Sequence, residues 1–184
     1  MIIRTPIVFD NDCISSFLWI RRADILKVLF PKQIMLPEPV LNEIEKLKAF
    51  PTYSYIWDDL SSEISSGQVE LKKIYYPSAE ATEYAQLISM SNPKRIGKGE
   101  AAAIVLAKSC SGTLASNNLR DIMPYVRGGH PPFVSTDAIL YCFYDAGHMT
   151  VQDGCAIWNE MKSKKRMLPT CDFIEVVDRM RSVR

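Results

Sequence analysis

The chain has 184 residues, of which 47% are hydrophobic and 23% are charged, and its formal net charge is +1. This composition predicts a soluble globular protein with a full core, and it excludes a protein that coats nucleic acid through a general basic excess. No secretion signal is visible and no apolar run approaches the roughly 20 residues that cross a bilayer, so we expect a cytoplasmic protein without membrane contact. The five cysteines are scattered and lack a C-x-x-C spacing, so the sequence suggests neither a disulfide framework nor a zinc knuckle.

Strand-like runs alternate with helical periodicity in the first half of the chain. Strands are predicted at 6–10 and 33–37, and between them apolar residues recur every three or four positions, which predicts one helix over about 12–29. A further helix has Pro39 near its first turn, where proline is tolerated. A loop and a short helix that stops at Gly67 come next, and "VELKKIYY" is strand-like.

The second half continues the same alternation. A helix follows Pro77, and a strongly apolar helix, "GEAAAIVLAKSC", ends before Gly112. Short strands are predicted at 113–116 and 132–136, followed by two helices separated by Gly147 and a last extended piece at "FIEVV". The pattern predicts an α/β fold, a three-layer α/β/α sandwich around a mostly parallel sheet. We expect a single domain over 1–184, with its core at about 5–145 and a helical extension at about 148–184.

Two carboxylates, Asp10 and Asp12, follow the first predicted strand directly. Ligands of open parallel sheets bind outside the carboxyl ends of the strands, so both residues are candidates for a site. In the alternative interpretation, Asp12 only caps the following helix and Asp10 is a solvated loop residue.

Two further acids are expected near the same edge of the sheet. Glu43 shares a helical row with Val40 and Leu47, close to an apolar face, and Glu100 lies in the first turn of the apolar helix. An acid in a first turn also complements the helix dipole, which is the alternative role for Glu100. Acids converging from separate strand ends would repel one another without a cation. Mg²⁺ or Mn²⁺ suits such a site, and metal-assisted phosphodiester hydrolysis is the chemistry it supports.

Four stretches in chain order resemble the PIN-domain ribonucleases, a family that includes the VapC-like toxins: "IVFDNDCISSFL", "LPEPVLNEI", "IGKGEAAAIVLAK" and "LASNNLRDI". The resemblance implies a PIN-like domain and a divalent-metal-dependent endoribonuclease, the toxin of a toxin–antitoxin pair. It further implies RNA as substrate, an antitoxin protein as partner and a homodimer. Asp10, Glu43 and Glu100 are then catalytic metal ligands, with Asp12 where the family usually has a polar Asn.

The sequence departs from the family after the fourth strand, where many members have a further acid. The matching position is Asn118, whose amide can give a metal one neutral oxygen but no charge. Asp12 and Asp121 are the candidates to restore the lost charge as metal ligands, and Asp137 is a more distant one. The alternative is a PIN-like binding scaffold with weakened catalysis.

Substrate contacts are expected from basic residues near the strand ends: Lys94, Arg95, Lys98 and Arg120. They would anchor phosphates, and the alternative for each is a solvated position. We interpret the run "KSKKR" at 162–166 as a solvated helix end, and the alternative is a nucleic acid site. Aromatic residues, among them Trp19 and Tyr53, could stack on bases or serve helix packing and partner binding.

A second enzyme class shares the opening motif. "FDNDC" is similar to the D-x-D start of haloacid-dehalogenase-like phosphatases. Those enzymes also need a Ser or Thr at the end of the second strand and a late acidic pair after an apolar strand. Here the second strand ends in Pro37, and Asp58 and Asp59 fall in a predicted helix, which disfavours the phosphatase.

Overall fold

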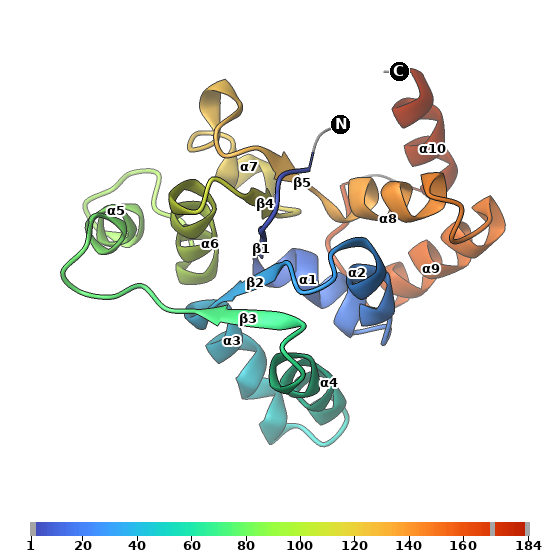
Figure 1. Ribbon diagram of the computed structural model, residues 1–184, viewed down its shortest axis with the longest axis horizontal. Helices are drawn as coiled ribbons and strands as arrows, with labels where there is room; N and C mark the ends of the chain where they lie inside the picture. The colour runs from blue at the N-terminus through green and yellow to red at the C-terminus, as the bar shows by residue number, and fades with distance from the viewer. Residues whose placement is uncertain (1–2, 170–171, 183–184) are drawn as a thin grey trace.

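A computed structural model describes residues 3–169 and 172–182 (Figure 1). Its centre is a sheet of five strands, all parallel, in the order β3-β2-β1-β4-β5. The strands are β1 (Ile7–Phe9), β2 (Ile34–Pro37), β3 (Val69–Lys72), β4 (Thr113–Ala115) and β5 (Phe133–Val134). The predicted three-layer α/β/α sandwich is confirmed, and the sheet is wholly parallel.

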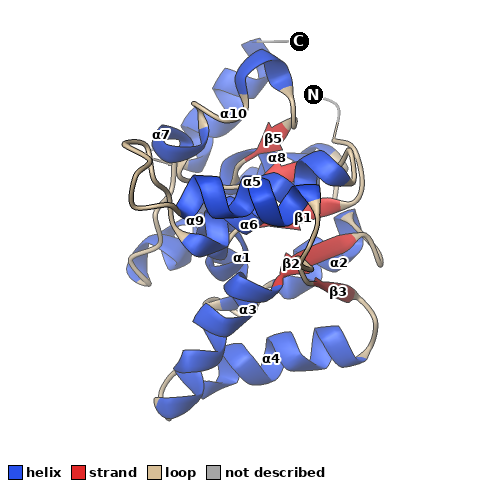
Figure 2. Ribbon diagram, turned by 90° about the vertical axis from the view of Figure 1, so that its left-hand side faces the viewer, coloured by secondary structure: helices blue, strands red, loops and turns tan. Residues whose placement is uncertain are grey.

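Helices cover both faces of the sheet (Figures 1 and 2). They are α1 (Asn11–Leu18), α2 (Ala23–Leu29), α3 (Glu38–Glu45), η1 (Lys46–Ala49), α4 (Ser54–Ser65), α5 (Ala79–Ile88), α6 (Lys98–Ser109), α7 (Leu119–Ile122), η2 (Arg127–Gly129), α8 (Thr136–Asp145), α9 (Val151–Ser163) and α10 (Phe173–Ser182). Figure 2 shows α4 at one end of the molecule and α10 at the other.

The central strand divides its side chains between two cores. Ile7 and Phe9 point into one apolar cluster, which α1, α2 and α8 help to build, whereas Val8 joins a second cluster built largely by α6. All three side chains are fully buried. Alternate residues of a strand face opposite sides of a sheet, so a strand covered on both faces is apolar throughout. This explains why the strand reads as an uninterrupted apolar run.

The helix predicted over about 12–29 is wrong in its continuity, because the chain forms α1 and α2 with a break between them. Arg21 adopts a φ of 55°, outside the helical region. The Tyr55 hydroxyl donates to the Trp19 carbonyl at 2.8 Å, so a residue distant in sequence satisfies a carbonyl at the end of α1. The apolar spacing continues across the break, because both helices pack on the same core.

The extended piece predicted at "FIEVV" is also wrong, because these residues begin α10. Phe173, Val176 and Val177 are buried on one side of the helix, the i, i+3, i+4 spacing of a helical face. The Phe173 ring packs 6.4 Å from the Trp158 ring and leaves no room for a side chain at Gly154, where a Cβ would lie 2.2 Å from the ring. The C-terminal helices therefore share the core cluster of β1.

Four of the five cysteines lie in the described part of the chain. Cys13, Cys110, Cys142 and Cys155 form no disulfide bond there, and Cys171 lies outside the described residues. Over residues 3–169 and 172–182, no helix combines the length and the apolar character that a membrane span requires.

Candidate functional site

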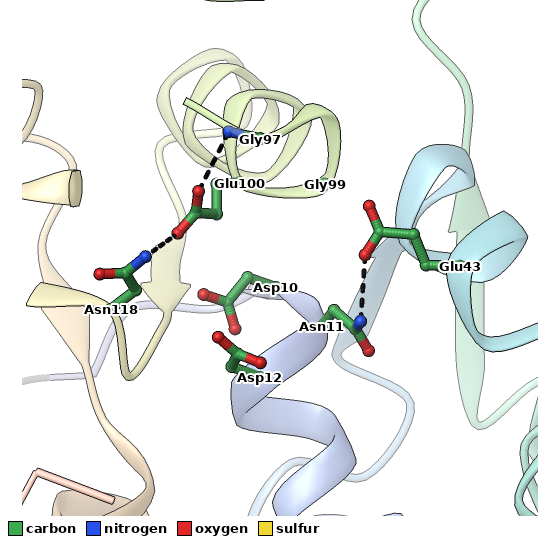
Figure 3. A pocket seen from close by; sticks show the side chains of 8 residues that line it. All are labelled: Asp10, Asn11, Asp12, Glu43, Gly97, Gly99, Glu100 and Asn118. Carbon is green, nitrogen blue, oxygen red and sulfur yellow. Dashed lines mark hydrogen bonds between the residues drawn. The ribbon is translucent and has the colours of Figure 1, made fainter. Parts of the chain in front are cut away.

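A pocket of about 210 Å³ opens where β1 and β4 end and α1 and α6 begin, with Glu43 of α3 at its side (Figure 3). Its lining consists of Asp10, Asn11, Asp12, Glu43, Gly97, Gly99, Glu100 and Asn118. The structure thus brings together five residues that the sequence marked separately: Asp10, Asp12, Glu43, Glu100 and Asn118. The pocket lies outside the carboxyl ends of neighbouring parallel strands, the usual position for a ligand site in this class of fold.

Asp10 is the most buried acid of the pocket, with 1% of its surface exposed. It is the N-cap of α1, and its Oδ1 accepts a hydrogen bond from the Cys13 backbone N–H at 2.8 Å. Its Oδ2 is buried and has no hydrogen-bond partner among the described residues. The alternative in which Asp12 caps the helix and Asp10 is solvated is therefore wrong, because the cap and the buried group are both Asp10.

Burial raises the pKa of Asp10 from 3.8 to about 7. The Ser116 side chain and the Cys13 backbone N–H lower the pKa, whereas the charges of Asp12 and Glu100 raise it further. The folded protein therefore disfavours the ionised form of a carboxyl group that has one unpaired oxygen. A positive charge in the pocket would reverse this penalty.

Glu43 reaches the pocket from α3 and is fixed by Asn11, the first residue of α1 (Figure 3). Asn11 Nδ2 donates to Glu43 Oε2 at 3.0 Å, and Asn11 Oδ1 accepts from Ser15 Oγ at 2.8 Å. The sequence-based reasoning assigned no role to Asn11. Its position directly after Asp10, with Ser15 four residues on along the same helical face, is the signal that was available.

Gly99 permits the close approach of α3 and α6 beside Glu43. A Cβ at this position would lie 3.2 Å from Val40 Cγ2 and 3.3 Å from Glu43 Oε1. We expect Gly99→Ala to shift the Glu43 carboxylate and to lower the melting temperature by roughly 4 °C, since adding a methyl group to a close contact costs about 1–3 kcal/mol. The comparison is the thermal unfolding of Gly99→Ala against that of Lys108→Ala, at the far end of α6. Equal melting temperatures would show that this helix spacing does not constrain Glu43.

Glu100 is held by two hydrogen bonds. Its Oε2 accepts from the Gly97 backbone N–H at 3.2 Å, and its Oε1 accepts from Asn118 Nδ2 at 2.6 Å. Burial raises its pKa, the two hydrogen bonds oppose this, and Asp121 and Asp12 add to the rise. Glu100 thus serves the start of α6, as the alternative interpretation expected, and also points into the pocket.

Asn118 bridges two carboxylates. Its Nδ2 donates to Glu100 Oε1 and also to Asp121 Oδ2, at 2.9 Å. The amide therefore presents its donors to the acids. Asp121 does not line this pocket and instead lines a neighbouring one, of about 400 Å³, together with Arg95 and Lys98.

Asn117 is a second residue that the sequence-based reasoning missed. It is 5% exposed, and its Oδ1 accepts from the Thr136 backbone N–H at 2.9 Å. Its Nδ2 donates to the Met167 carbonyl at 2.9 Å and lies 3.5 Å from the Asp12 carbonyl. One buried amide thus joins β4, α1, α8 and the segment after α9. A run of two asparagines at the end of a buried strand was the signal in the sequence.

The remaining candidates are spread around this centre. Lys94, Arg95, Lys98 and Arg120 are all exposed, on the loop before α6, on α6 itself and on α7. Asp137 is buried outside the pocket lining and pairs with Arg179 and Ser135. The acidic pair of the phosphatase interpretation lies in α4, where Asp59 binds Arg21 at 3.1 Å.

The donor set of the pocket fits a hard divalent cation. Within the described part of the chain, no three His, Cys, Asp or Glu side chains form a ready-made metal cage. Mg²⁺, however, is usually held by one or two carboxylates and keeps several waters. The buried, unpaired Oδ2 of Asp10 beside the carboxylates of Asp12 and Glu100 supplies this arrangement.

Comparisons with known proteins bear on the fold. No protein-family model matches the sequence, and no curated protein matches it. Among solved structures, the chain is similar to one described as FitAB bound to an IR36 DNA fragment, with 17% sequence identity and a TM-score of 0.50. The alignment covers 71% of this chain and 94% of that chain. This likeness supports the PIN-like fold.

Proposed function

We propose that the protein is a divalent-metal-dependent endoribonuclease of PIN-like fold. The observation that carries the proposal is Asp10, a buried carboxylate with an unpaired oxygen at the mouth of the central strand, with Asp12 and Glu100 close enough to raise its pKa. Folding leaves one oxygen of this buried group without a hydrogen bond, which is typical of positions kept for a ligand.

Asp10 and Asp12 would hold Mg²⁺ or Mn²⁺, with Glu100 on the opposite side of the pocket (Figure 3). The ion, when bound, supplies an activated water and neutralises the charge that develops at phosphorus. Asn118 keeps Glu100 directed at the pocket, and Asn11 does the same for Glu43. Glu43 approaches from α3 and would accept a proton from the attacking water.

Basic residues beside the pocket would bind the substrate. Arg95 and Lys98 line the neighbouring pocket together with Asp121. A phosphate of the RNA bound in that pocket would lie next to the metal site. Lys94 and Arg120 would add positive charge to the same rim. Together these groups offset the repulsion between an acidic pocket and an anionic strand.

The sequence resemblance to the VapC-like group supports a role as the toxin of a toxin–antitoxin pair. On this proposal the partner is an antitoxin protein, the active form is a homodimer and the protein acts in the cytoplasm. The fold likeness to FitAB is compatible with this assignment.

Cleavage of labelled RNA tests the proposal. Purified protein with Mn²⁺ is expected to cut RNA, and EDTA, Asp10→Asn or Glu100→Gln is expected to abolish cutting. Single-stranded and duplex DNA belong in the same assay, because the solved structure of similar fold contains DNA. Equal cleavage of DNA would contradict the assignment as a ribonuclease. Activity that survives EDTA would contradict the metal.

A PIN-like binding scaffold is the second candidate, and one observation favours it. Both oxygens of Glu100 already accept hydrogen bonds, and Asn118 stands where many PIN domains have an acid. Folded protein that neither binds Mn²⁺ nor cuts RNA, but still binds RNA, would support this scaffold role.

A further inference from the structure

The segment after α9 lies against the candidate site. The run "KSKKR" is predicted to be a solvated helix end, but α9 ends at Ser163 and Arg166 lies beyond it, half-buried. Its guanidinium carbon is 4.4 Å from the centre of the Trp19 ring. Burial lowers the pKa of Arg166, and the nearby Asp12 and Tyr55 raise it. Arg166 is therefore a cation next to an acid of the pocket.

Asn117 fixes this segment in place. Its Nδ2 donates to the carbonyl of Met167, the residue after Arg166, and lies 3.3 Å from Ser16 Oγ on α1. Asn117 directly precedes Asn118, which lines the pocket. The backbone beside Arg166 is thus tied to the same strand end that forms the site.

The guanidinium of Arg166 retains hydrogen-bonding capacity. Its Nε donates to the Lys164 carbonyl at 3.2 Å, and the ion pairs found among the described residues do not include Arg166. An arginine stacked on an aromatic ring keeps the N–H groups of its edge available, in a geometry that matches a phosphate. The centre of the Trp19 ring lies 4.9 Å from that of the Tyr53 ring, and this contact holds Trp19 in place beside Arg166.

Positive charge consequently flanks the acidic pocket on two sides. Arg95 and Lys98 lie on the side of Glu100 and Asp121, and Arg166 lies on the side of Asp12. An RNA strand that crosses the pocket would contact a cationic side chain on each side of the metal site.

We infer that Arg166 is a substrate-positioning residue, whose guanidinium, held by Trp19 and the Asn117 contact, binds a phosphate of the RNA on the Asp12 side of the pocket. This inference rests on the proposed ribonuclease function. It assigns part of the substrate site to the C-terminal segment, for which the sequence favoured a solvated helix end over a nucleic acid site.

RNA binding to Glu100→Gln protein in EDTA, followed by fluorescence anisotropy, tests the inference without cleavage. Adding Arg166→Ala is expected to raise the Kd about tenfold. The slope of log Kd against log salt concentration should fall by about 0.7, the value for one phosphate contact of a single strand. Arg166→Lys should restore the salt dependence and part of the affinity. Lys164→Ala, in the same segment and exposed, should stay within about twofold.

Thermal unfolding of the same variants separates binding from packing. An unchanged Kd and salt dependence for Arg166→Ala would overturn the inference, and so would a loss of affinity that merely follows a lower melting temperature. If the parent protein cuts RNA but Arg166→Ala binds normally, only this inference fails. If wild-type protein neither binds nor cuts RNA, the proposed function fails with it.

Discussion

Replacing Asp10 by Asn is expected to abolish metal-dependent cleavage and, at the same time, to stabilise the metal-free protein near pH 8. The substitution keeps an oxygen that can accept from the Cys13 backbone N–H, so the cap of α1 survives. It removes a negative charge that is 1% exposed and has an unpaired oxygen. Stability and function therefore oppose each other at this residue.

The direction of the pH effect follows from the raised pKa. Asp10 has a pKa of about 7 in the folded protein against 3.8 as the ordinary value. Its contribution to stability is fully present below the lower value and is lost as the pH rises through the higher one. The loss amounts to at most ~4 kcal/mol, or roughly 10 °C in melting temperature for a chain of this size.

Thermal unfolding in EDTA between about pH 4 and 8 measures this effect. The wild-type melting temperature is expected to fall with rising pH relative to that of Asp10→Asn. Asp178→Asn, at an exposed position on α10, serves as the control and should follow the wild type. Parallel pH profiles for wild type and Asp10→Asn would contradict the account of a carboxyl group whose pKa is raised by burial.

Replacing Asn118 by Asp is expected to destabilise the metal-free protein and to strengthen metal binding. Asn118 Nδ2 donates to both Glu100 Oε1 and Asp121 Oδ2. An aspartate would lose both hydrogen bonds and place a third negative charge between two others. We expect a loss of about 2–4 kcal/mol in the stability of the metal-free protein near neutral pH.

The same substitution should strengthen metal binding, because affinity for hard cations rises with the number of charged oxygen ligands. We expect about tenfold tighter Mn²⁺ binding by calorimetry and a larger rise in melting temperature on adding Mn²⁺. Asn118→Ala is the matched control, since it removes the hydrogen bonds without adding charge. Weaker Mn²⁺ binding by Asn118→Asp than by Asn118→Ala would show that this position does not face the ion.

The sequence predicted the fold well because its signals are local. The apolar runs, the helical spacing and the glycine stops define most elements, and parallel strands place their carboxyl ends at one edge. That rule accounts for Asp10 at the end of β1, whereas Glu43 reaches the same edge from within α3 and Glu100 from the start of α6, which follows a helix and not a strand. These three residues do line one pocket.

The predictions that failed depend on contacts between distant residues. The break after α1 is accompanied by a hydrogen bond from Tyr55, and "FIEVV" is helical because its apolar face packs on Trp158. The roles of Asn11 and Asn117 arise from side-chain hydrogen bonds across 32 and 50 positions, which no local pattern records. Arg166 lies in a charged run whose composition is typical of a solvated surface.

A Mn²⁺ titration followed by calorimetry tests the central claim, that the pocket around Asp10 holds a divalent cation. Wild-type protein and Asp178→Asn are expected to bind Mn²⁺ with equal affinity and to release a proton near neutral pH, because the ligand must be ionised. Asp10→Asn is expected to show no binding. Equal binding by Asp10→Asn, or none by folded wild-type protein, would contradict the claim.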